Sequence, residues 1–144
     1  MNRQFQKSAL QAYNNVSTAI NPTTPYTLTL GNVCTDTGCS IKAQNSGVKI
    51  VNSGLYTFHF DASVVNGATV GTLQAQLYKD GVPLPCSLAD VSLDANVAGN
   101  LSFETTLAVN TCCNIQPVFT VVFTSDAITD LTIVHTNLGV VKQA

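Results

Sequence analysis

The chain has 144 residues, of which 10% are charged and 45% are apolar, and its formal net charge is −2. This length fits one domain that buries roughly two thirds of its unfolded surface. The small negative charge and the scattered basic residues argue against a nucleic-acid-binding protein, and no apolar run is long enough to span a bilayer. The first twenty residues contain no continuous apolar segment, so we expect synthesis in the cytoplasm without a signal peptide.

Residues 1–21 show the periodicity of a helix. Apolar side chains recur there at alternating four- and three-residue steps, at Phe5, Ala9, Ala12 and Val16. This spacing is typical of one apolar helix face and predicts a short helical arm. Pro22 would end the helix, because the residue before a proline is disfavoured in the helical conformation. A helix this short is marginal alone in water, so we expect it to pack on copies of itself, on its own domain or on another protein.

From residue 22 onward the pattern changes to alternation of apolar and polar residues, separated by turn residues. This predicts strands over residues 26–30, 48–51, 55–65, 73–78, 87–93, 101–109, 118–124 and 131–136. A loop with Cys34 and Cys39 is expected between the first two of these strands. Short strands joined by turns favour an all-β, antiparallel sandwich or barrel of about eight strands. We therefore divide the chain into an arm, residues 1–21, and one domain, residues 22–144.

The strand predicted over residues 55–65 has two contrasting faces. Because side chains alternate across a strand, Tyr56, Phe58 and Phe60 lie on one face. Thr57, His59 and Asp61 lie on the other face. Three aromatic side chains in a row belong in a core between two sheets, where each contributes a few kcal/mol through burial.

Two segments carry a resemblance to a known family, "SGLYTFHFDASV" and, two dozen residues later, "AQLYKDGVPLP". Gly54, Tyr56, Phe58, Leu77, Lys79 and Gly81 match the pattern of the C1q/TNF-like jelly-roll superfamily. The resemblance covers about residues 26–138 and implies that "LTIVHTNLG" forms the last strand, next to the first. It also implies a homotrimer in which Thr57, His59 and Asp61 lie near a threefold axis. Three copies of His59 would then bond to Asp61 or hold an ion or water; the alternatives are a solvent-facing histidine and buried packing without an ion.

Metal and catalytic sites are not expected. The superfamily has calcium-binding members, but Asp90, Asp94, Asp126 and Asp130 are spread along this sequence rather than clustered. The spacing of Cys34, Cys39, Cys112 and Cys113 is a poor match to a zinc site. We expect free, buried cysteines, with a disulfide as the alternative. Since no motif assembles a nucleophile with a base, we predict no cofactor and no enzymatic activity.

A helical arm that leads into such a head resembles small virion proteins of tailed phages, which decorate the capsid or form short head fibres. The resemblance implies a trimeric structural protein of the virion, attached to a capsid or other large shell through residues 1–21. One alternative is the head domain of a spore-surface protein of the exosporium type, although the Gly-x-y repeats of those proteins are missing here. Another is a carbohydrate- or ligand-binding module with a glycan at its exposed loops, against which the absence of tryptophan counts.

Overall fold

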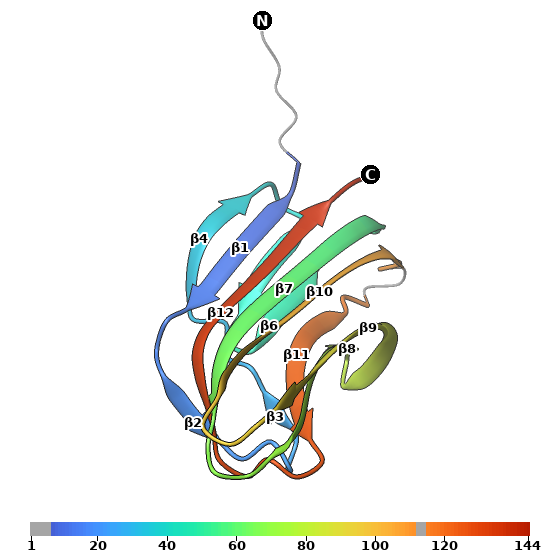
Figure 1. The fold of residues 1–144 in the computed structure, drawn as a ribbon. Coiled ribbons are helices and arrows are strands. Elements are labelled where there is room, and N and C mark those ends of the chain that lie inside the picture. The colour runs from blue at the N-terminus through green and yellow to red at the C-terminus, as the bar shows by residue number, and fades with distance from the viewer. Residues whose placement is uncertain (1–6, 112–114) are drawn as a thin grey trace, which may run out of the picture.

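The computed structural model describes residues 7–111 and 115–144, and all the regular elements in these ranges are strands. Twelve strands form two antiparallel six-stranded sheets that pack face to face as a sandwich (Figure 1). The first sheet has the order β10-β7-β12-β1-β4, with β2 paired to β12, and the second has the order β5-β6-β11-β8-β9, with β3 paired to β11. The fold is thus an all-β sandwich, as predicted. No helix in the described ranges is long and apolar enough to cross a membrane.

The first sheet contains β1 (Ala9–Asn14), β2 (Thr18–Ile20), β4 (Asn32–Thr37), β7 (Gly54–Asn66), β10 (Ala98–Val109) and β12 (Leu131–Lys142). The second sheet contains β3 (Tyr26–Thr27), β5 (Ile41–Gln44), β6 (Gly47–Ile50), β8 (Gly71–Lys79), β9 (Val82–Leu93) and β11 (Val118–Ser125).

The predicted helical arm is wrong. Phe5 lies outside the described residues, but Ala9 and Ala12 belong to β1, which lies between β12 and β4 and pairs with both. Leu10 and Ala12 are 2% and 1% exposed, whereas Val16, the fourth residue of the predicted helix face, is 71% exposed. The burial therefore alternates along β1, as in a strand. Hydrogen bonds to strands on both sides stabilise this conformation, and they outweigh the weak intrinsic helix propensity of the segment.

The eight predicted strands correspond to β3 and β6 to β12, and the other four strands were missed. The expected loop around Cys34 and Cys39 instead contains β4 and leads into β5. β4 is an edge strand whose side chains are mostly exposed, so it lacks the apolar alternation that marks a half-buried strand. Only Tyr26–Thr27 forms β3, but Leu28 and Leu30 are buried and their amides donate hydrogen bonds to Val121 O and Asn45 O.

The core lies between the two sheets. Tyr56, Phe58 and Phe60 of β7 are at most 1% exposed and point toward the second sheet. The ring of Phe58 lies 4.8 Å from that of Phe119 of β11, and the ring of Phe60 lies 6.0 Å from that of Phe123. Since β7 is in the first sheet and β11 is in the second, these contacts join the layers directly.

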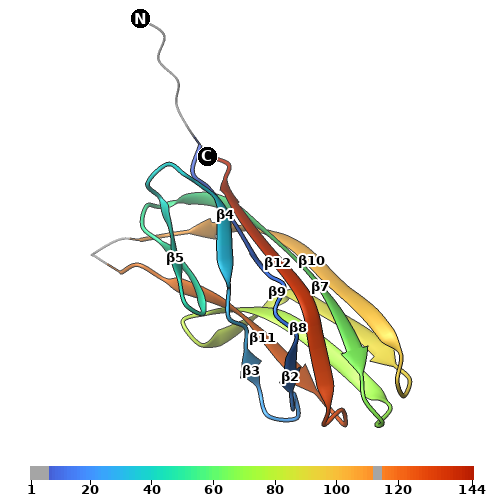
Figure 2. The ribbon, with the colours of Figure 1, turned by 90° about the vertical axis from the view of Figure 1, so that its left-hand side faces the viewer.

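The two ends of the sandwich differ in what they contain. We call one end the terminal pole: it holds residues 7–8, residues 142–144 and the β8–β9 turn at Asp80 and Gly81 (Figures 1 and 2). Both turn residues have positive φ angles, 50° and 83°, which suits a two-residue hairpin turn. The other end, the distal pole, holds the loops of residues 67–70, 94–97 and 126–130. Asn66 joins two of these loops by donating hydrogen bonds to Thr69 O (2.7 Å) and Asp94 O (3.0 Å).

Candidate functional site

The outer face of the first sheet is the candidate site, because it carries both histidines of the chain. Thr57, His59 and Asp61 point away from the core on β7. Their partners across β10 are Thr106, Glu104 and Ser102, and their partners across β12 are Val141, Gly139 and Asn137. The three predicted residues therefore lie together in the middle of a broad, mostly polar sheet face.

His59 lies over the backbone of the neighbouring strand. A Cβ atom built at Gly139 would overlap the imidazole of His59 and would come within 2.7 Å of Gln11 Oε1. Glycine at this position of β12 therefore makes room for the His59 ring between β7 and β1. The ring and the Gln11 amide end up on the same small area of the face.

A chain of hydrogen bonds extends from this point along β12. Gln11 Nε2 donates to Asn137 Oδ1 at 2.7 Å, and Asn137 Nδ2 lies 3.5 Å from His135 Nε2. The Nδ1 of His135 bonds to Asn15 Oδ1, in the link between β1 and β2. These partners assign the proton of neutral His135 to Nδ1, where it is donated to the amide oxygen. The side chains in this series of hydrogen bonds therefore find most of their partners within the subunit.

Thr57 is held in a second group of hydrogen bonds, nearer the terminal pole. Its hydroxyl lies 3.0 Å from that of Thr106 and accepts a hydrogen bond from Gln143 Nε2 at 3.2 Å. Apolar side chains flank the polar centre on β7: Leu55 and Val65 are each 39% exposed. The face therefore combines a polar centre, part of which is hydrogen-bonded within the subunit, with apolar positions toward both poles, a composition that suits contact with another protein surface.

The described cysteines and acidic residues do not gather into a metal site. Cys34, Cys39 and Cys86 are free but exposed, which corrects the expectation of burial, and Cys112 and Cys113 lie outside the described residues. In residues 7–111 and 115–144, no group of three histidine, cysteine or acidic side chains could hold an ion. Asp126 instead accepts a hydrogen bond from the amide of Thr72 at 3.0 Å, a structural role at the start of β8.

Sequence reasoning placed Thr57, His59 and Asp61 on one face but missed their neighbours. Gln11 and Asn15 come from the segment that was predicted to be a helix, and His135, Asn137 and Gly139 come from the last strand. The alternation in "HTNLG" shows that His135 and Asn137 share a face. Nothing in the local sequence indicates that this face adjoins His59.

No known family profile matches the sequence, and neither does any curated protein. Solved structures do match the fold. Murine APRIL is 15% identical with a TM-score of 0.70, covering 95% of this chain and 99% of the APRIL chain. The globular domain of zebrafish complement 1qA is 15% identical with a TM-score of 0.65, covering 96% and 98% of the two chains.

A third match is the vertex protein P5 of phage PRD1, which is 16% identical with a TM-score of 0.57. This match covers 94% of the present chain and 96% of the P5 chain. At these identities the similarity establishes the fold and not the function. The chain therefore has the C1q/TNF-like jelly-roll fold that its Gly-x-Tyr-x-Phe strand predicts, and this fold is shared with a phage vertex protein.

Proposed function

We propose that the protein is a non-enzymatic structural protein of a phage particle, a trimeric jelly-roll head that decorates the capsid or forms a head fibre. The observation that carries this proposal is the match to the PRD1 vertex protein P5 over 94% of the chain. A jelly-roll head can occupy a position on a shell without catalysing a reaction. The two sheets pack their aromatic side chains against each other, which gives the rigid body that such a role needs.

The outer face of the first sheet is the proposed subunit contact. In a C1q/TNF-like trimer this face would turn toward the threefold axis, which brings three copies of Thr57, His59 and Asp61 near one another. Thr57, Gln11 and Asn137 are already hydrogen-bonded within the subunit, so burying these side chains leaves few of their polar groups unpaired, while His59 and Asp61 would find partners across the contact. Leu55 and Val65, which are exposed on either side of this polar centre, would stabilise the contact by burying their apolar surface in it.

Attachment to the particle is proposed to occur through the beginning of the chain, at the terminal pole. A helix cannot provide it, because residues 9–14 are part of the first sheet. Residues 7 and 8, which precede β1, lie at the terminal pole, where Ser8 O accepts a hydrogen bond from the amide of Lys142 at the end of β12. The distal pole would then face away from the shell, with its loops open to solvent or to a glycan.

Light scattering coupled to size exclusion tests the trimer. We expect a mass of three times the 15.2 kDa chain mass at micromolar concentration. Thr57→Arg should dissociate the trimer, because three added guanidinium groups would meet near the axis. Thr124→Arg is the matched control, since Thr124 faces outward on the second sheet. A monomeric wild-type protein, or equal behaviour of the two variants, would contradict the proposed contact.

Mass spectrometry of purified particles tests the location. The protein should be found in particles that have been washed free of soluble host proteins. Its absence from particles, together with its presence on spore surfaces, would replace the phage proposal with the spore-surface alternative.

A further inference from the structure

The described lysines lie at one pole of the domain, and four of its eight acidic residues lie at or beside the other pole. All five lysines of the described residues lie at the terminal pole: Lys7, Lys42, Lys49, Lys79 and Lys142. The pairing of the strands places them there, because Lys79 and Lys49 both flank the start of β11 and Lys42 lies opposite Lys49. The amide of Lys142 donates to Ser8 O, which brings Lys7 to the same end.

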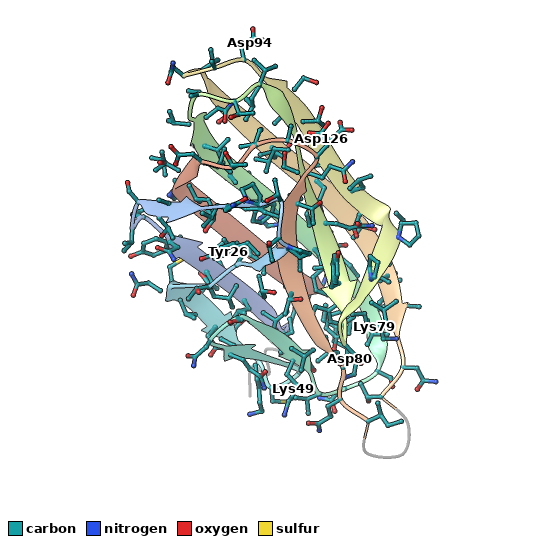
Figure 3. All side chains as sticks on the ribbon, turned by 90° about the horizontal axis from the view of Figure 1, so that it is seen from below. Tyr26, Lys49, Lys79, Asp80, Asp94 and Asp126 are labelled. Atoms are coloured by element: carbon teal, nitrogen blue, oxygen red, sulfur yellow. The ribbon has the colours of Figure 1, made fainter. Side chains whose placement is uncertain are left out.

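The distal pole has the opposite charge. Asp94, Asp126 and Asp130 lie in its loops, and Asp90 lies on the adjoining part of β9. No lysine or arginine of the described ranges is found at this end. Figure 3 shows Lys49 and Lys79 at one end of the sandwich, beside Asp80, and Asp94 and Asp126 toward the other end. This distribution gives the domain an electric dipole that runs from the distal pole to the terminal pole, and such a dipole orients the molecule in the field of a charged partner.

A pocket of about 280 Å³ opens between two of the lysines at the terminal pole. It is lined by Lys7, Ser8, Gly38, Cys39, Ser40 and Lys142, together with residues 143–144. Gly38 has a φ of +74°, and a Cβ atom there would overlap Ser8, so glycine allows the β4–β5 link to close this wall. The Oγ of Ser8 accepts a hydrogen bond from the amide of Ser40 at 3.0 Å, and its own hydroxyl hydrogen is left to donate. Lys7 and Lys142 are thus at the rim of a pocket that also holds the Ser8 hydroxyl, and lysine and hydroxyl donors suit a carboxylate.

We propose that the terminal pole is a docking surface for an acidic protein surface, and that the pocket between Lys7 and Lys142 receives a carboxylate side chain of that partner. The identification of the partner with a capsid shell rests on the proposed function; the preference for carboxylates rests on the lysines and the pocket alone. The same partner would repel the negative distal pole, so the head would approach the partner with its terminal pole first.

A protein partner fits this pole better than a nucleic acid does. Asp36 on β4 and Asp80 in the β8–β9 turn lie among the five lysines. These carboxylates would repel a continuous row of phosphates, whereas a protein surface of mixed charge can pair with both signs. Affinity for nucleic acid grows with the number of phosphates neutralised, and the two aspartates reduce that number here.

Binding of the full chain to immobilised poly-L-glutamate tests the inference. The wild-type protein should bind at 25 mM NaCl and be released at 300 mM, because salt screens exposed charges. The double variant Lys7→Gln/Lys142→Gln should bind about tenfold more weakly, the effect of losing two partly exposed charge pairs. The control Leu88→Glu/Ser92→Glu lowers the net charge equally, but at exposed positions of β9, and its affinity should change less than twofold.

Three outcomes would overturn the inference: no binding at 25 mM, equal loss in both double variants, or tighter binding to duplex DNA than to poly-L-glutamate at the same salt. Particle analysis separates this failure from that of the proposed function. A protein that is absent from particles yet binds poly-L-glutamate through Lys7 and Lys142 refutes the phage role and leaves the docking surface intact. A protein that is present on particles but whose binding to poly-L-glutamate is unchanged by the lysine substitutions refutes the docking surface and leaves the phage role intact.

Discussion

Truncation of Leu10 tests whether the N-terminal segment is a core strand or a detachable arm. Leu10 is 2% exposed in β1, between two neighbouring strands, whereas Val16 is 71% exposed after the strand ends. A helix with the predicted apolar face would use Val16 and not Leu10. The two placements therefore predict opposite effects for Leu10→Ala and Val16→Ala.

The magnitude follows from the burial of the two side chains. Leu10→Ala removes three buried carbon groups at about 0.8 kcal/mol each, and the cavity that remains raises the total to about 3–5 kcal/mol. Val16→Ala should change the free energy of unfolding by less than about 0.5 kcal/mol, as at other exposed positions. The expected loss for Leu10→Ala is a large part of the stability of a typical domain, about 5–15 kcal/mol.

Urea unfolding followed by circular dichroism measures both values. All variants should be compared at one protein concentration, because subunit association adds to the apparent stability. The slope of the free energy of unfolding against urea concentration should be similar for all variants, so that differences between their midpoints report differences in stability. A loss below about 1 kcal/mol for Leu10→Ala, or a larger loss for Val16→Ala, would refute the placement of β1 in the sheet.

Two further substitutions probe the core strand β7. Phe58→Ala should cost about 3–5 kcal/mol, because the ring is fully buried against Phe119, and urea unfolding with Leu88→Ala as the exposed control will measure it. Tyr56→Phe should cost about 1 kcal/mol at neutral pH, since the hydroxyl donates to Asn52 O at 2.6 Å. Burial raises the pKa of Tyr56 above 10.0, so wild-type stability should fall as pH rises past 10, where the unfolded chain ionises first; unfolding of Tyr56→Phe should show a smaller fall.

The sequence predicted the second half of the fold more accurately than the first. β7 is long and alternates large aromatic with polar side chains, a pattern that fits only a half-buried strand. In β1, Leu10 and Ala12 fit a strand while Ala9 and Ala12 fit a helix, so the local pattern supports both. Hydrogen bonds from β12 and β4 on both sides favour the strand over the helix. This pairing cannot be inferred from the six residues of β1 alone.

The candidate site was predictable only within a single strand. Alternation alone puts Thr57, His59 and Asp61 on one face. The contacts across the face depend on pairing over long distances: Gln11 bonds to a residue 126 positions away, and Asn15 bonds to one 120 positions away. A close approach such as that of His59 to Gly139 becomes visible only when β7 and β12 are placed side by side.

The proposed trimer and the proposed docking surface strengthen each other physically. Strands β7 and β12 run from one pole to the other, so packing the outer face of their sheet around an axis parallel to these strands keeps like poles together. Three sets of five lysines would then gather at one end and three sets of distal aspartates at the other. The proposed trimer would therefore bind a shell multivalently, because three weak carboxylate contacts held by one rigid body dissociate together far more slowly than any one of them alone. A monomer with the same lysines would bind weakly and reversibly, so disrupting the trimer with Thr57→Arg should also loosen attachment, even though Thr57 lies on the outer face of the first sheet and not in the pocket.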